Sequence, residues 1–210
     1  MDVAPTMVLL GFTQIASNGM RMVLWRKHVQ WRLMLSFTLG ALVAFAFMRM
    51  LAFLPSKGLV YIMIGGLPFC IEILPQRWIP VITRKGAPFL CGAIITALQM
   101  VGGTAGNVLA AFFQTSPLGR REIVATKAMM QLLGHGLRVV YFGSLTGLGV
   151  LQSSWWVVVA TMGMAMLGTT LGGMVLSRMS DSGFRNWSQW AIRAISLLYL
   201  FRGFYLLATG

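Results

Sequence analysis

Residues 87–113 read APFLCGAIITALQMVGGTAGNVLAAFF and decide the fold. The stretch is apolar and longer than the roughly 20 residues that a helix needs to cross a bilayer. Its middle, however, reads GGTAG at residues 102–106, with three glycines in five residues. Glycine in a helix interior is unfavourable because it loses the most backbone freedom on folding. One straight helix is therefore not expected, and the chain is predicted to bend at these glycines.

The composition around this stretch indicates a protein embedded in a lipid bilayer. The chain has 210 residues, of which 57% are hydrophobic and 10% are charged, and its mean hydropathy is +0.77. Soluble globular domains contain about a quarter of charged residues, and disordered chains lack such long apolar runs. Both classes are therefore excluded, and the bilayer is the first expected partner of the chain.

The net charge of +13 comes from 17 Lys and Arg residues against four acids. In a soluble chain this excess would suggest binding to nucleic acid. Here the basic residues stand between apolar stretches, where they set the orientation of a multi-spanning protein, so no nucleic-acid partner is expected. The two cysteines, Cys70 and Cys91, lack CxxC spacing, and no disulfide framework, zinc site or other cofactor is predicted.

Six stretches are apolar and long enough to cross the hydrocarbon layer at 1.5 Å of rise per residue. They are residues 7–25, 33–53, 58–74, 123–142, 155–177 and 189–208. Cytoplasmic loops carry an excess of Lys and Arg, so Arg26 and Lys27 place the first loop in the cytoplasm. Arg84 and Lys85 place the third connection there, and the uncharged loop 143–154 is expected outside.

Both ends of residues 87–113 are then cytoplasmic, because Arg120 and Arg121 precede a helix that must run outward. A single crossing cannot have both ends on one side, so we expect a re-entrant hairpin bent at the glycines. Irregular backbone is tolerated at membrane depth only where protein or a water-filled cavity surrounds it. The predicted fold is an all-α polytopic integral membrane protein with about six transmembrane helices and this one hairpin.

An internal repeat divides the chain into residues 1–86 and 87–210, each with three predicted spans. At an offset of 117 residues, Gln, Gly, Arg and Val coincide between residues 14–23 and 131–140, and Asn18 falls opposite His135. An odd number of spans makes successive copies antiparallel in the membrane. Inverted repeats with a broken helix near the midplane are a recurring design of secondary transporters, with the substrate site at the repeat interface.

Several short motifs carry a resemblance to a known family. The second half contains GGTAGN at 102–107, GRR at 119–121, VATKA at 124–128 and GHGLR at 134–138, and the first half contains SNGMR at 17–21 and WRKHV at 25–29. In this order the motifs resemble the TauE/SafE family of sulfite-exporter-like permeases, over nearly the whole chain. The resemblance implies export or uptake of small sulfur-containing or carboxylate anions across a bacterial inner membrane.

Two polar stripes are candidates for the anion site. Each stripe has the spacing i, i+4, i+7, which places its members on one face of a helix; they are Gln14, Asn18 and Arg21, and Gln131, His135 and Arg138. Polar stripes on membrane helices face the protein interior or a cavity, so the two stripes are expected to hold an anion between the repeats. The alternative is contact between helices, with the two arginines reaching the lipid headgroups.

The glycine bend is the second candidate, comprising Gly102, Gly103, Thr104, Gly106 and Asn107. If a second half-helix begins near Asn107, its free N–H groups and the positive end of its dipole would point into a mid-membrane cavity and favour an oxyanion. Thr104 and Asn107 would add side-chain donors. The alternative is that these glycines only permit close helix packing.

The remaining charged residues receive structural interpretations. Glu72 is expected to pair with Arg77, and Arg49, Arg193 and Arg202, each near a span end, are expected to extend toward the headgroups.

An enzyme is not expected, because the four acids are unpaired in the sequence and neither histidine has a second metal ligand nearby.

The competing function is a non-transporting truncated membrane protein or a partner subunit of a permease. Family members carry a Gly-rich segment before each repeat, and residues 1–86 lack the first. A misassigned start and a natural variant both account for this. Assembly with further copies of the chain stays open.

Overall fold

The computed structural model describes residues 3–103, 105–147, 149–176 and 181–209, with side chains except at 146, 149–154, 172–176 and 181–188. Within these ranges all regular elements are helices. They are α1 (Val3–Trp25), α2 (Trp31–Leu51), α3 (Lys57–Ile73), α4 (Ala87–Gly102), α5 (Gly106–Phe113), α6 (Arg120–Thr146), α7 (Gly149–Leu176) and α8 (Asp181–Thr209), with short 3-10 turns η1 (Arg26–His28) and η2 (Gln76–Trp78). Each of the six predicted spans coincides with one long helix.

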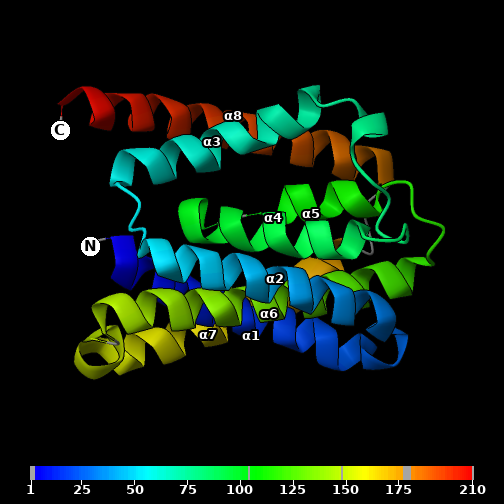
Figure 1. Cartoon of the computed structure of the whole chain (residues 1–210), viewed down its shortest axis with the longest axis horizontal. Helices are drawn as coiled ribbons and strands as arrows, with labels where there is room; N and C mark the ends of the chain where they lie inside the picture. The colour runs from blue at the N-terminus through cyan, green and yellow to red at the C-terminus, as the bar shows by residue number, and fades with distance from the viewer. Residues whose placement is uncertain (1–2, 104, 148, 177–180, 210) are drawn as a thin grey trace.

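The helices lie along one common direction in three layers (Figure 1). The pair α3 and α8 forms one outer layer, α4 and α5 lie in the middle, and α1, α2, α6 and α7 form the other outer layer. The most extensive packing joins α1 to α6, α2 to α4, and α3 to α8. In the view of Figure 1, α1 and α6 run in opposite directions, as do α2 and α7, and α3 and α8.

The predicted break within residues 87–113 is present and falls at Gly103. This residue ends α4 with φ 70° and ψ −7°, in the left-handed region that favours glycine. The chain then reverses, and α5 returns beside α4, so that the start of α4 and the end of α5 lie at the same end of the bundle (Figure 1). The local glycine content thus produces a helical hairpin in place of one long helix.

Other glycines serve close helix packing. A Cβ atom on Gly40 of α2 would overlap the carbonyl oxygen of Phe89, and one on Gly92 of α4 would overlap the carbonyl oxygen of Phe37. In the α3–α8 pair, a Cβ on Gly65 would lie 2.5 Å from the carbonyl oxygen of Ser196. Only a residue without a side chain allows backbones to approach this closely.

Two apolar clusters fill the interior. One includes Phe37, Ile82 and Leu109 and lies toward the end of the bundle at which α5 ends and α6 begins. The other includes Met7 and Met100 and lies toward the opposite end. The polar groups described below lie between the second cluster and the α3–α8 pair.

Two helical segments, Trp31–Leu51 and Gln189–Thr209, are long and apolar enough to cross a membrane by length and composition. Two further apolar helical segments, Ala87–Gly102 and Trp155–Leu171, are shorter. Buried residues are a minority of both long segments, at 33% of the first and 11% of the second. Leu35 and Met50 of α2 and Leu198 and Phe201 of α8 are among the most exposed apolar side chains.

Candidate functional site

A cavity of about 420 Å³ lies beside the glycine bend, between α1, α3, α6, α8 and the ends of α4 and α5 that face each other. Most of the predicted site residues line it: Gln14, Gly102, Gly103, Gly106, Gln131, His135 and Arg138. The two candidates of the sequence, the bend and the stripe on α6, therefore belong to one site.

Arg138 is the deepest charged group of this site. Its side chain is fully buried, and Nη1 donates a hydrogen bond to the carbonyl oxygen of Gly103. Its Nε and Nη2 atoms have no hydrogen-bond partner among the described residues. A guanidinium stays protonated in proteins, and a buried charge without a partner is costly. Nε and Nη2 form one edge of the guanidinium, the edge that binds two oxygens of a carboxylate or similar anion.

The neighbours of Arg138 leave further polar atoms unsatisfied. The Nδ1 atom of His135 and the Oε1 atom of Gln99 are buried and have no partner in the described part of the chain. Gly134 makes room for the amide of Gln99, since a Cβ on Gly134 would lie 3.0 Å from the Gln99 Cδ. Among the side chains described, no carboxylate lines the cavity. The site therefore combines the buried charge of Arg138 with neutral hydrogen-bonding groups and the exposed Lys57.

The bend itself closes the cavity on the α4 side. The Gly103 amide donates to the carbonyl of Gln99, at 3.1 Å, and a Cβ on Gly103 would lie 2.7 Å from the Met7 Sδ. Helix α5 begins at Gly106, one residue before the predicted Asn107. A Cβ on Gly106 would lie 3.3 Å from the Gln131 Nε2. Backbone and side-chain donors thus come close together at the start of α5.

Four predicted residues are not part of this lining. Asn18 is buried, but its amide donates to the backbone oxygen of Gln14 at 3.0 Å. Arg21 is exposed, and Asn107 is exposed and lines two neighbouring cavities. Thr104 lies outside the described residues. The structure therefore brings the α6 stripe to the cavity, but only the first member of the α1 stripe.

The antiparallel packing of α1 and α6 explains why the two arginines do not converge. Gly11 lies against Val139, whereas Gly19 lies near Leu132. The α1 stripe therefore runs toward one end of the bundle while the α6 stripe runs toward the other. Gln14 is brought to the cavity with Arg138, and Arg21 is carried away from it.

The structure overturns one expectation for the other charged residues, the pairing of Glu72, and shows what three arginines contact. Glu72 does not pair with Arg77 but forms an ion pair with Arg193 of α8, with both side chains about half exposed. Arg193, expected from the sequence to extend toward the headgroups, is the partner in this ion pair. Arg49 donates to the Ser144 hydroxyl at 3.0 Å, and the Arg202 guanidinium lies 5.4 Å from the centre of the Tyr205 ring.

Sequence reasoning missed several lining residues. Gln99 carries a detectable signal, because it is an isolated amide in an apolar helix, three residues before the glycine pair. Met7, Tyr61 and Tyr199 carry none, because they come from three separate helices and are ordinary membrane-helix residues by type. The Tyr61 and Tyr199 rings lie 5.4 Å apart and join α3 to α8 beside the cavity.

Comparison with known proteins assigns neither a family nor a function to this site. No family model matches the chain, and no curated protein or solved structure matches it significantly.

Proposed function

We propose that this chain is a multi-pass membrane permease for small anions. In this proposal α1, α2, α3, α6, α7 and α8 cross the bilayer, and the α4–α5 hairpin enters and leaves on one side. The exposed apolar faces of α2 and α8 support this arrangement, because soluble monomers rarely expose such large apolar surfaces.

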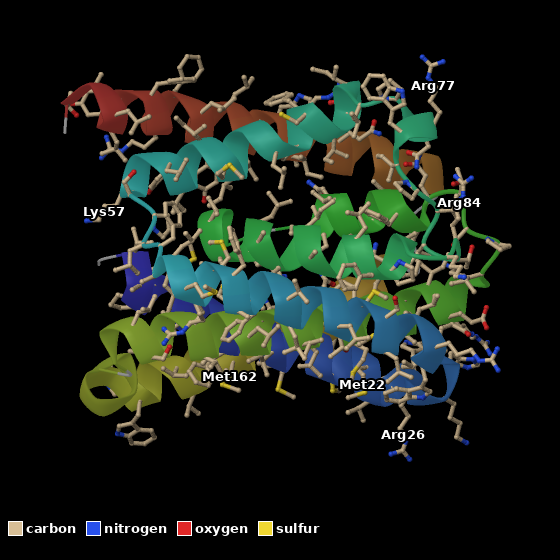
Figure 2. The ribbon with its side chains drawn as sticks, in the orientation of Figure 1. Met22, Arg26, Lys57, Arg77, Arg84 and Met162 are labelled. Atoms are coloured by element: carbon tan, nitrogen blue, oxygen red, sulfur yellow. The ribbon has the colours of Figure 1, made fainter. Side chains whose placement is uncertain are left out.

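The distribution of basic residues supports the orientation. Figure 2 shows Arg26, Arg77 and Arg84 at one end of the bundle and Lys57 at the other. The end with the arginines is proposed as the cytoplasmic end, following the excess of basic residues in cytoplasmic loops. The opposite directions of α1 and α6, and of α3 and α8, are those of an inverted repeat (Figure 1).

The single observation that carries the proposed function is that Arg138 lines the cavity while its buried Nε and Nη2 atoms have no hydrogen-bond partner among the described residues. An oxyanion loses its hydration when it enters a membrane protein, at a large cost unless donors and positive charge replace the water. Arg138 supplies the charge, and His135, Gln131 and Gln14 are close enough to the same space to complete the shell. The substrate class, sulfite, organosulfonates or short carboxylates at a bacterial inner membrane, follows from the sequence resemblance alone.

A binding screen on the purified chain tests this function. Sulfite, thiosulfate, sulfoacetate and short carboxylates are titrated against the wild type, Arg138→Gln and the control Arg202→Gln, and thermal stabilisation is measured. Two charge-assisted hydrogen bonds are worth about 3–6 kcal/mol together, which corresponds to at least about a hundredfold in affinity. We expect that loss in Arg138→Gln and no loss in the control. Equal binding by both variants, or no binding by the wild type, would refute the proposed function.

A further inference from the structure

Three neighbouring cavities form a row along α3. The first is the 420 Å³ cavity that contains Arg138, the second has about 170 Å³, and the third has about 550 Å³. The first and second share Ile64, Ala105 and Gly106 as lining residues. The second and third share Asn107 and Ile192, together with Pro68 of α3. Each cavity therefore lies next to the following one, with shared residues between them.

The row extends from one end of the bundle to the other. The first cavity reaches Lys57, the first residue of α3, and the third reaches Ile73, the last. At 1.5 Å per residue, these 17 residues of α3 are about 25 Å long, which is close to the thickness of the hydrocarbon layer. The row thus has the length that a passage across a bilayer requires.

The two walls of the row belong to different units of the fold. One wall is the α3–α8 pair, which is held together by backbone contacts at Gly65 and Gly203. The other wall is the α4–α5 hairpin, which α3 contacts less extensively than it contacts α8. Pro68 lies inside α3 at the middle cavity and cannot donate to the carbonyl of Ile64, so α3 lacks one helical hydrogen bond there. This wall therefore lacks one helical hydrogen bond beside the smallest of the three cavities.

The polarity of the row changes along its length. The middle cavity is lined largely by apolar side chains, including Leu67 and Ile195. The third cavity is polar again, with amides from Gln76, Gln114 and Gln189. Among the described residues that line the three cavities, Glu72 is the one acid, and its ion pair with Arg193 neutralises it.

We propose that the anion crosses between the α3–α8 pair and the α4–α5 hairpin, from Arg138 past Gly106 and Asn107 to the amides of the third cavity, with the middle cavity as the constriction. The route rests on the proposed function. The start of α5 offers N–H groups, and the Asn107 side chain offers an amide, where the first cavity meets the second. The constriction separates two polar compartments, as alternating access requires.

Cysteine accessibility tests the route without depending on transport. In a background with Cys70→Ser and Cys91→Ala, single cysteines replace Asn107, Ile192 or Leu198 in proteoliposomes. A charged thiosulfonate reacts only where water reaches the thiol. We expect reaction at positions 107 and 192 and none at 198, which lies on α8 but does not line any cavity of the row. Equal reaction at 192 and 198, or none at 107 and 192, overturns the route.

A matched pair of tryptophan variants then tests passage. Ile195 lines the middle cavity and Leu198 does not, although both are exposed residues of α8. Ile195→Trp should reduce anion flux to background while binding at Arg138 is retained, and Leu198→Trp should keep both. Normal flux in Ile195→Trp overturns the route but leaves the proposed function intact. Absence of both binding and flux in the wild type refutes the proposed function, whatever the cysteine pattern.

Discussion

Alanine substitutions of the two glycines that flank α4, Gly86 and Gly103, distinguish the cost of backbone strain from damage to the anion site. Gly86 precedes the helix with φ 83°, and Gly103 ends it with φ 70°, so both occupy the left-handed region. Alanine in that region costs about 1–2 kcal/mol. A Cβ on Gly86 meets no described atom within 4 Å, whereas one on Gly103 lies 2.7 Å from the Met7 Sδ and 3.5 Å from the Arg138 Nη1.

The expected magnitudes follow from these contacts. Gly86→Ala should lose about 1–2 kcal/mol of unfolding free energy from strain alone. Gly103→Ala should lose about 1–3 kcal/mol more of unfolding free energy than Gly86→Ala, because overpacking forces Met7 to move. Its anion affinity should also fall, since the carbonyl of Gly103 positions the Arg138 guanidinium. Gly86→Ala should bind anions like the wild type.

Thermal unfolding in detergent, followed by the fluorescence of the seven tryptophans, measures the stability difference. Anion titration of the same samples measures the affinity. The reasoning fails if the two variants lose equal stability and Gly103→Ala binds anions with unchanged affinity. In that case the bend would be a packing feature without influence on Arg138.

Three further predictions concern packing and orientation. Gly40→Leu should separate α2 from α4 and lower the unfolding temperature. Gly168→Leu should not lower it, because a Cβ at Gly168 meets no described atom within 4 Å. Equal unfolding temperatures of the two variants would contradict this prediction. Tyr141→Phe removes the one hydroxyl proton shared between the Met48 and Phe53 carbonyls around the end of α2. It should cost about 1–3 kcal/mol in the same melt, without a change in anion affinity. Single cysteines at Arg84 and Lys57 should be labelled from opposite sides of sealed vesicles, and labelling from one side would disprove the assigned orientation.

The helices and the bend could be predicted because their causes are local. Each long helix follows from an apolar run of sufficient length. The boundaries of α1, α2, α3 and α6 lie within four residues of the predicted ones, whereas α7 and α8 begin six and eight residues earlier than predicted. The break at Gly103 follows from glycine content and a left-handed backbone angle that other residues avoid. The start of α5 differs from the prediction by one residue, which is within the usual uncertainty of helix ends.

The composition of the site could be predicted only in part. Helical spacing correctly groups Gln131, His135 and Arg138 on a face that borders the cavity. The same spacing on α1 groups Gln14 with Arg21, yet only Gln14 reaches the cavity. Spacing defines a face within one helix, whereas convergence of two faces depends on how far the helices are displaced along each other.

The sequence by itself determines an all-helical, strongly apolar chain with basic residues at its connections and a glycine bend in its middle. These properties depend on residues near one another in the chain, so periodicity and composition reveal them. Only the tertiary structure decides that Arg138 is buried with its Nε and Nη2 unpartnered among the described residues, that Gln99 lines the same cavity, and that Glu72 is paired with Arg193. Helices satisfy their own backbone hydrogen bonds, but the partners of Arg138 and Glu72 come from other segments of the chain, and packing alone selects them.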